Sequence, residues 1–244
     1  MTTQRQKPDI LATSPKSSQS KAIIFDAGTL ITLAMNGLLP ELKDLKKIFN
    51  GKFLITDEVK KEVIDRPINT KRFELEALKL QDMLNKKILE LPSSLGIKPR
   101  EISDNTDKYL QIANSTFSAN GNNIKIVDLG EISCLALSKV LNDRKIKNVI
   151  AADERTIRVL SEKPDNLKSL FQKKLKTRIK ANPKNYDYFK EFKFIRSAEI
   201  VYVAYKKGVI KLTGPLVLDA LLYAVKYKGC AISGDEIREI ERIK

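Results

Sequence analysis

Acidic residues recur beside short apolar runs that are typical of β-strands. Asp26 directly follows the apolar run 22–25, and Asp153 and Glu154 follow the run 148–152. Glu62 lies on a helical run just after the apolar residues 53–55, and Glu131 opens the run 131–137. Acids this far apart in the chain meet only in a folded protein, and two unit charges about 4 Å apart repel by about 1 kcal/mol in water and about 4 near a protein surface. A cluster of these carboxylates would therefore need Mg²⁺ or Mn²⁺ among them, which points to metal-assisted hydrolysis of phosphodiesters.

The composition excludes most other catalytic groups. The chain contains no histidine, which removes Ser-His-Asp and Cys-His triads and imidazole general bases. Its two cysteines, Cys134 and Cys230, stand in apolar surroundings and are too few for a thiolate zinc site or a disulfide framework. We interpret both as core thiols in a reducing cytoplasm. Chemistry in this protein must rest on carboxylates, Lys, Arg, hydroxyl groups and metal.

The 244 residues carry 45 Lys and Arg against 30 Asp and Glu, a net charge of +15. Such an excess favours nucleic acid or an acidic membrane surface as a partner, although a lysine-rich proteome is an alternative explanation. No apolar run approaches the roughly 20 residues of a membrane span. The polar N-terminus is unlike a secretory signal. We therefore expect a cytoplasmic protein that binds nucleic acid and no membrane.

Short apolar strands alternate with helical segments through the first two thirds of the chain, which predicts an α/β fold with a mostly parallel sheet. Strands are expected at 21–25, 53–55, 88–91 and 148–152, a turn-rich loop at 118–123, and a helix from 212 to 226. Residues 1–20 are expected to form a disordered tail. In such sheets the ligand site lies at the carboxyl ends of the strands, where Asp26 and Asp153 stand.

The segment 161–196 differs in composition from the rest. It holds eleven Lys or Arg and six aromatic residues, and we predict a basic insert that contacts phosphates. The candidate RNA-binding residues are Lys173, Lys174, Lys176, Arg178 and Lys180. Its aromatic side chains either stack on unpaired bases or pack the insert onto the domain. Residues 197–244 are predicted to be a mostly helical C-terminal segment that packs on the core.

Four stretches in order resemble the motifs of PIN-domain nucleases. These are IIFDAGTLI (23–31), FLITDEVKKEV (53–63), DLGEISCLAL (128–137) and IAADERTIR (150–158). The resemblance covers about residues 21–160. It implies a PIN-like nuclease core over that range, with a small parallel sheet between helices as a three-layer α/β/α fold. It also implies a Mg²⁺- or Mn²⁺-dependent ribonuclease.

The resemblance further implies that Asp26, Glu62, Glu131 and Asp153 line one pocket as catalytic metal ligands. Glu154 is an alternative to Asp153. In this scheme Asp26 anchors the cation, Glu131 and Asp153 complete its shell, Glu62 orients a water or binds a second ion, and the water attacks in line. Members include toxin ribonucleases, which pair with antitoxins, and RNA-processing nucleases, and they often form homodimers. Gly28 departs from the family, which often has Ser or Asn there, and Thr29 is a candidate substitute.

Each acid also has an ordinary structural explanation. Asp26 and Asp153 suit helix N-caps, Glu131 suits a first helical turn, and Glu62 suits a solvated helix face. Thr56 either supports Glu62 or caps its helix. Two other functions remain as alternatives: an inactive PIN-like module that binds RNA or protein, and a haloacid-dehalogenase-like phosphatase. The phosphatase is the weaker of the two because Gly28 stands where that family has its second Asp.

Overall fold

The computed structural model describes residues 21–243 and is built around a four-stranded parallel sheet. The strands are β1 (Lys21–Phe25), β2 (Lys52–Leu54), β5 (Lys147–Ala151) and β7 (Phe194–Ile195), in the order β2-β1-β5-β7. β1 and β5 share the longest register, from the pair Lys21 and Lys147 to the pair Phe25 and Ala151. The predicted α/β class with a small parallel sheet is confirmed. The expected tail, residues 1–20, lies outside the described residues.

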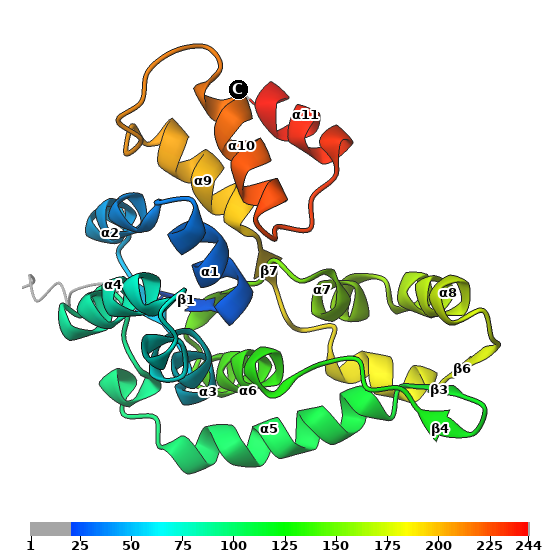
Figure 1. The fold of residues 1–244 in the computed structure, drawn as a ribbon. Helices are drawn as coiled ribbons and strands as arrows, with labels where there is room; N and C mark the ends of the chain where they lie inside the picture. The colour runs from blue at the N-terminus through cyan, green and yellow to red at the C-terminus, as the bar shows by residue number, and fades with distance from the viewer. Residues whose placement is uncertain (1–20, 244) are drawn as a thin grey trace, which may run out of the picture.

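Helices lie on both sides of this sheet, an arrangement compatible with three layers (Figure 1). Helix α6 (Leu129–Asp143) contacts β1 and β5, and α5 (Pro99–Asn114) covers α6 from outside. Helices α1 (Ala27–Met35) and α2 (Leu39–Ile48) both contact α9 (Ser197–Lys206), and α9 also contacts β7. Helix α3 (Asp57–Lys60) packs on α6 and runs into a single π-helical turn, Lys61–Asp65. Helix α4 (Glu74–Asn85) packs against that turn.

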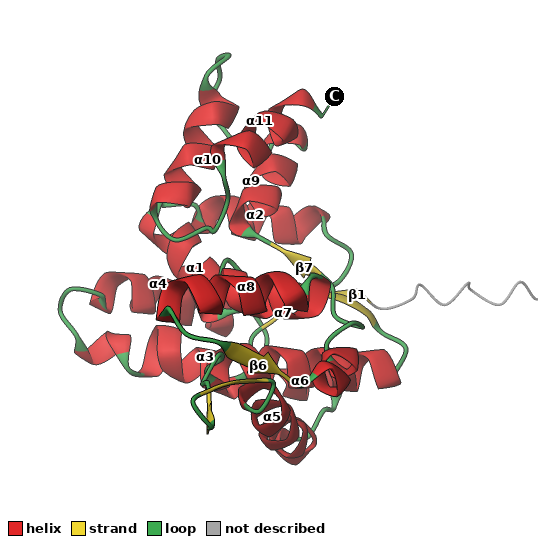
Figure 2. Ribbon diagram, turned by 90° about the vertical axis from the view of Figure 1, so that its right-hand side faces the viewer, coloured by secondary structure: helices red, strands yellow, loops and turns green. Residues whose placement is uncertain are grey.

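Two further groups of helices pack beside the elements described above: α7 (Arg155–Glu162) with α8 (Pro164–Leu175), and α10 (Val217–Tyr227) and α11 (Gly234–Arg242) with α9. Helix α8 also contacts the short strand β6 (Ile179–Ala181), which Figure 2 shows beside α7 and α8. Helices α10 and α11 join α9 in a C-terminal helical group at the top of Figure 1. Short 3₁₀ turns occupy Pro67–Asn69, Pro92–Leu95 and Pro183–Tyr188. No described helix has both the length and the apolar content that crossing a bilayer requires.

A second, small antiparallel sheet stands where a loop was expected. Its strands are β3 (Phe117–Ala119), β4 (Asn122–Asn123) and β6 (Ile179–Ala181), in the order β4-β3-β6. Asn120 and Gly121 join β3 to β4 with φ values of 49° and 83°. Positive φ at both central residues is the geometry of a tight hairpin turn, and Asn-Gly is its preferred sequence. The turn was foreseen, whereas its two strands were too short to be recognised.

The expected strand 88–91 is reduced to a single bridge between Leu54 and Glu90. The amides of Ile88 and Leu89 both donate to Met83 O at the end of α4, so they are not available to a sheet. Pro92 then ends the segment because proline has no N–H to donate. The fourth strand of the main sheet is instead β7, which comes from the basic segment 161–196.

The helix expected from residue 212 begins later, at Val217. Pro215 follows Gly214, whose φ of 131° is incompatible with a helix. The residue before a proline also disfavours the helical conformation. The conformation of Gly214 and Pro215 therefore sets the start of α10, and the apolar pattern alone does not predict it.

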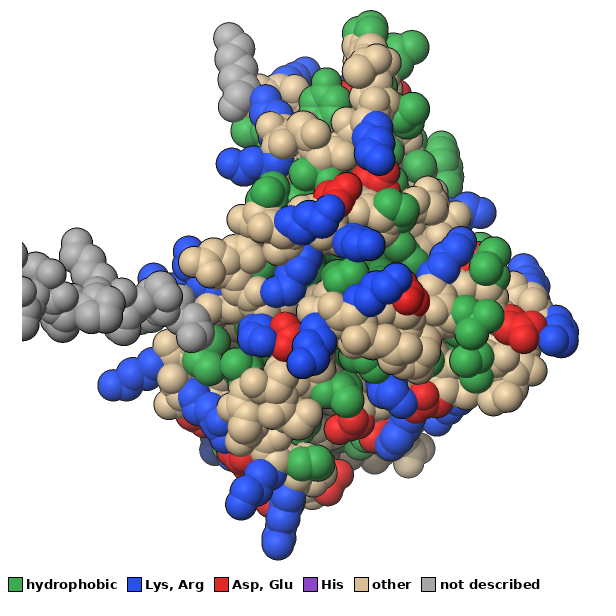
Figure 3. Space-filling model, turned by 90° about the vertical axis from the view of Figure 1, so that its left-hand side faces the viewer, with side chains coloured by type: hydrophobic (Ala, Val, Ile, Leu, Met, Phe, Trp, Pro, Cys, Tyr) green, Lys and Arg blue, Asp and Glu red, His purple; other side chains and the backbone are tan. Residues whose placement is uncertain are grey.

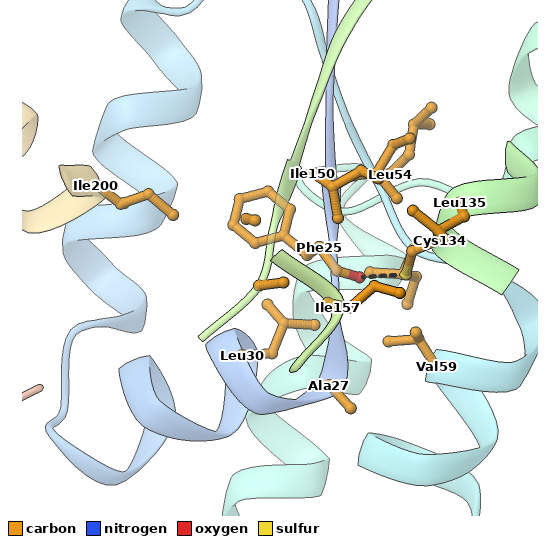
Figure 4. Close-up of a cluster of buried hydrophobic side chains, with 14 of the residues drawn as sticks. Phe25, Ala27, Leu30, Leu54, Val59, Cys134, Leu135, Ile150, Ile157 and Ile200 are labelled. Carbon is orange, nitrogen blue, oxygen red and sulfur yellow. Dashed lines mark hydrogen bonds between the residues drawn. The ribbon is translucent and has the colours of Figure 1, made fainter. Parts of the chain in front are cut away.

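The core centres on the sheet strands and the helices that cover them. Phe25, Leu54 and Ile150 from three strands lie together with Leu135 of α6 and Ile157 of α7 (Figure 4). Phe25 and Phe53 contact edge to face with ring centroids 5.2 Å apart. Cys134 donates a weak hydrogen bond from Sγ to Phe25 O at 3.8 Å. Both cysteines are buried and free, as predicted.

Leu54→Ala should destabilise the fold far more than Leu75→Ala. Leu54 is fully buried at 0 % exposure, whereas Leu75 on α4 is 59 % exposed. The buried substitution removes apolar contacts and leaves a cavity, so we expect a loss of about 2–5 kcal/mol in the free energy of unfolding. The exposed one should change it by less than about 0.5 kcal/mol. Urea denaturation followed by circular dichroism measures both, and equal losses would contradict the assigned core.

Candidate carboxylate site

Four of the five acids singled out from the sequence line one depression of about 420 Å³. The acidic lining consists of Asp26, Glu62, Asp128, Glu131 and Glu154. The rest of the lining consists of Gly28, Lys125, Ile126, Val127 and Thr156. Lys125 forms an ion pair with Asp128 at 2.5 Å. The depression thus lies where the carboxyl ends of β1 and β5 meet the first turn of α6. Parallel strands bring distant acids together here, as expected.

Asp26 is held rigidly at the end of β1. Its backbone N–H donates to Ala151 O at 2.9 Å, which extends the pairing of β1 with β5 by one residue. Its Oδ2 accepts from Gly28 N at 3.3 Å and so caps α1. The side chain is 95 % removed from solvent, since its relative exposure is 5 %. Burial, with the nearby charges of Glu62 and Asp153, raises the pKa of Asp26 to about 6 against the lowering effect of the Ala27 and Gly28 amides.

Glu131 stands in the first turn of α6 and is held through one oxygen. Its Oε2 accepts from Asp128 N at 3.0 Å in a capping box, so the first-turn explanation is confirmed. Its Oε1 is buried and has no hydrogen-bond partner among the described residues. Burial, followed by the charges of Asp26, Glu154 and Asp128, raises the pKa of Glu131 to about 8. One oxygen of this carboxyl group is therefore positioned and unsatisfied.

Glu62 reaches the depression from the π-helical turn Lys61–Asp65. Single π turns within α-helices are frequent at functional sites, and the apolar pattern of the sequence did not predict this one. Its carboxylate lies against Gly130 at the start of α6, where a Cβ would approach Oε2 to 2.8 Å. Because Gly130 has no side chain, the Glu62 carboxylate can occupy this position. Burial and the charge of Asp128 raise the pKa of Glu62 against the opposing charge of Arg66.

The pair Asp153 and Glu154 divides between two positions. Glu154 lines the depression and caps α7 by accepting from Thr156 N at 3.3 Å and Thr156 Oγ1 at 2.8 Å. Asp153 is buried, and its Oδ1 accepts from Ser197 N at 2.7 Å, which ties the end of β5 to the start of α9. Its Oδ2 is buried without a partner among the described residues. The expected N-cap on α7 is thus wrong for Asp153 and falls to Glu154.

Of the two hydroxyl groups with expected roles, Thr56 takes the simpler one and Thr29 does not take its own. Thr56 accepts from Val59 N at 3.2 Å and caps α3, so the capping interpretation is confirmed. It also shares a 2.6 Å hydrogen bond with Ser133 Oγ, which links α3 to α6. Thr29 is fully buried, and its Oγ1 has no partner among the described residues. Thr29 therefore does not replace a hydroxyl group at position 28 by bonding to a carboxylate.

The donor chemistry of the depression suits a hard divalent cation. The acidic side chains of the lining offer carboxylate oxygens, and one of these, Glu131 Oε1, is buried and lacks a partner in the described part of the chain. Asp153 Oδ2 also lacks a described partner, but Asp153 does not line the depression. Raised pKa values of Asp26 and Glu131 show that this site disfavours their ionised forms without a positive charge nearby. Within residues 21–243, however, no group of three or more acids or cysteines is arranged to hold a metal ion directly.

The basic segment places its candidate RNA-binding residues on the surface. Lys173 and Lys174 lie in the last turn of α8, and Lys176 follows at a φ of 49°. Arg178 directly precedes β6, and Lys180 lies within it. All five side chains are exposed. On the opposite side of the molecule, Figure 3 shows Lys and Arg spread over the face with Asp and Glu among them, not gathered in one patch.

Most aromatic residues of the basic segment pack inward. Phe171 and Tyr186 lie against Phe117 with centroids 5.6 Å and 6.1 Å apart. Phe189 and Phe192 pack on Tyr109 at 6.0 Å and 5.6 Å. The packing interpretation is confirmed for these side chains. Tyr188, 44 % exposed beside Lys108, is the one large exposed aromatic of this segment within the described residues.

Comparisons with protein-family models, curated proteins and solved structures find no match for this chain.

Two residues that line the depression were not predicted from the sequence. They are Asp128, which is also the N-cap residue of α6, and Lys125 beside it. The signal for Asp128 was present, because Asp followed three residues later by Glu before an apolar run is a capping pattern. Lys125 belongs to an irregular loop and carried no such signal.

Glu131→Gln should stabilise the protein in EDTA above about pH 8 and change little near pH 4. The pKa of Glu131 rises from its ordinary 4.5 to about 8 on folding, so its favourable contribution is complete below 4.5 and is lost as the pH rises through 8. A neutral amide escapes that loss, and we expect a gain of about 1 kcal/mol or more at pH 9. Urea denaturation at both pH values measures it.

Glu101→Gln is the matched control, because Glu101 occupies the same capping-box position of α5. The Lys98 amide and Arg144 lower the pKa of Glu101, so its ionised form favours folding. That contribution is present above its ordinary pKa and lost as the pH falls, so the substitution should destabilise at pH 9. The same sign of change in both variants would contradict the electrostatics assigned to Glu131.

Proposed function

We propose that this protein is an endoribonuclease with a PIN-like three-layer fold that hydrolyses RNA phosphodiester bonds with Mg²⁺ or Mn²⁺. One observation carries the proposal: carboxylates from four separate segments line one depression at the carboxyl ends of parallel strands. The order of these acids in the chain is that of the PIN motifs. The absence of histidine and of a thiolate cluster leaves them as the available catalytic groups.

Asp26, Glu62 and Glu131 would hold the cation, with Asp153 behind them and Glu154 at the rim. A bound Mg²⁺ or Mn²⁺ supplies positive charge that stabilises the developing phosphate anion and lowers the pKa of water. The protein contributes positioned oxygens. Asp26 is fixed by the Gly28 amide and Glu131 by the Asp128 amide, so neither needs to be ordered when RNA arrives. Glu62 approaches from the π-helical turn and is placed to orient a water.

RNA as the substrate agrees with the charge of the chain. The net charge of +15 provides long-range attraction for a polyanion, and the exposed cations of α8 and β6 provide phosphate contacts. An antitoxin or RNA-processing partner and a homodimer follow from the resemblance alone, whereas a cytoplasmic location follows from the composition, and all three stay predictions.

A PIN-like module that binds RNA or protein without cutting is the second candidate. It is favoured by the finding that no three acids of the described chain are arranged to ligate a metal directly. The two candidates differ in one measurable property. The nuclease binds Mn²⁺ at the depression and turns over RNA, whereas the inactive module does not cleave.

Asp26→Asn should abolish a Mn²⁺-dependent cleavage of single-stranded or structured RNA. The amide keeps the size of the side chain and its bond from the Gly28 amide but loses the charge, so we expect the rate to fall by about 100-fold or more with the fold intact. Gel analysis of end-labelled RNA, with and without EDTA, measures it.

Asp57→Asn provides the control, since Asp57 is an exposed residue in the first turn of α3 and does not line the depression. It should cleave at the parent rate. An Asp26→Asn protein as active as the parent would overturn the assignment. If the parent melts at the same temperature with and without Mn²⁺ and cuts no RNA, the inactive module is the better description.

Replacing Lys173, Lys174, Lys176 and Arg178 by Gln should weaken RNA binding and flatten its salt dependence. Each lost phosphate contact reduces the slope of log K against log salt by about 0.7 of a unit for single-stranded RNA. The control replaces Lys43, Lys46, Lys47 and Lys79, four cations of α2 and α4, by Gln. Fluorescence anisotropy with labelled RNA in EDTA gives both slopes. Equal slopes for the two variants would place the RNA-binding face elsewhere.

A further inference from the structure

A second cavity of about 780 Å³ lies between α7, β7 and the start of α11. Four basic residues line it: Arg155, Arg158, Lys163 and Arg196. The acids Glu162, Glu199 and Glu236 also line it. Neither the PIN resemblance nor the proposed cleavage chemistry uses these residues. Its volume falls within the roughly 300–1,000 Å³ of cavities that bind small molecules.

Two of the acids are already neutralised by one arginine. Arg196 is largely buried and forms ion pairs with Glu199 at 2.5 Å and with Glu236 at 2.6 Å. Burial disfavours the charge of Glu236, but the Ser233 amide and Arg196 outweigh it and lower its pKa to about 2. Arg196 therefore has its counter-ions within the protein. These two acids do not serve the other cations of the cavity.

Arg158 lies beside Arg196 without a counter-ion. Arg158 Nη2 and Arg196 Nη1 both donate to Ala231 O, at 3.3 Å and 3.2 Å, so two guanidinium groups share one carbonyl. Arg158 Nη1 is buried and has no hydrogen-bond partner among the described residues. No carboxylate of residues 21–243 forms an ion pair with Arg158. A buried, unpaired donor on a like-charged pair is unfavourable unless an anion reaches it.

Arg155 and Lys163 also lack ion pairs within the described chain and stand on the wall of the same cavity. The three unpaired cations face one unpaired acid, Glu162. Apolar side chains, including Ile195 and Ile232, supply the remaining wall. A cationic end next to an apolar wall suits a ligand that carries an anionic group on an uncharged body.

We propose that this cavity binds a phosphate group carried by a nucleotide, with Arg158 as the central contact and Arg155 and Lys163 as flanking contacts. The planar guanidinium group donates two parallel hydrogen bonds to phosphate oxygens, which a carboxylate-lined site cannot offer. The apolar wall packs against the sugar and base. The phosphate belongs either to a free nucleotide or to an RNA strand, since Glu154 of the depression and Arg155 of the cavity are consecutive residues.

The test measures binding of three probes to the full-length protein in EDTA: adenosine monophosphate, inorganic phosphate and adenosine. Isothermal titration calorimetry should show that adenosine monophosphate binds, that phosphate binds more weakly and competes with it, and that adenosine does not bind measurably. Arg158→Gln keeps an amide donor for Ala231 O and removes the charge, so we expect an affinity loss of about tenfold or more. Arg155→Gln, at a more exposed position, should also weaken binding.

Arg100→Gln is the charge-matched control, because Arg100 is 89 % exposed on α5 and lies outside the cavity. It should bind like the parent. The proposal is overturned if the parent binds none of the phosphate probes, or if Arg158→Gln, Arg155→Gln and Arg100→Gln all bind like the parent.

A single-stranded RNA arm distinguishes the two sources of the phosphate. If RNA supplies it, Arg158→Gln weakens RNA binding and adenosine monophosphate competes with RNA. If a free nucleotide supplies it, RNA affinity is unchanged while adenosine monophosphate still binds the parent and not the variant. Both results support a phosphate site, and neither depends on whether the protein cleaves RNA.

Discussion

The parallel pairing of β1 with β5 is the constraint on which the site depends. Its register aligns Phe25 with Ala151, and the Asp26 amide continues the ladder to Ala151 O. Two segments more than 120 residues apart therefore end at the same edge, and the acids that follow them emerge side by side. Because side chains alternate along a strand, a shift of one residue would turn Asp26 away from its neighbours and expose part of the core. Phe25 and Ile150, both buried, oppose such a shift.

Bringing acids together at a partly buried edge of the sheet destabilises their ionised forms in the folded protein. The pKa values of Asp26 and Glu131 are raised for this reason, first because burial removes water from the carboxylates and second because the carboxylates repel one another. Local hydrogen bonds keep the groups in place: Asp26 caps α1, and Glu131 completes the capping box of α6. Capping a helix and lining the depression are therefore compatible for these residues. The same oxygen geometry that begins a helix presents the carboxyl group to the depression.

The segment after residue 161 belongs to the architecture as well as to the surface. β7 forms the fourth strand of the main sheet, and Phe189 and Phe192 pack on Tyr109 of α5. Asp153 holds the start of α9 through the Ser197 amide, and Arg196 binds Glu199 and Glu236 at the start of α11. The C-terminal helices are thus tied to the end of β5, next to the carboxylates. A movement of the C-terminal helices would therefore be transmitted to the end of β5 and to the candidate site through the contact between Asp153 and the Ser197 amide.

The sequence by itself determined the α/β class, the strands β1, β2 and β5, and three acids that line the depression together with the pair 153–154, because apolar runs and the acids beside them are local patterns. It also predicted the two buried thiols and the Thr56 cap. Only the tertiary structure decided which acid of the pair 153–154 faces the depression, because the Ser197 amide that takes Asp153 comes from α9. It likewise reduced residues 88–91 to a bridge, where Met83 O takes two amides, and placed Glu62 on a π turn against Gly130. These outcomes depend on partners that are distant in sequence or on competition for a single hydrogen-bond acceptor. The spacing of apolar residues along the chain predicts neither kind of interaction.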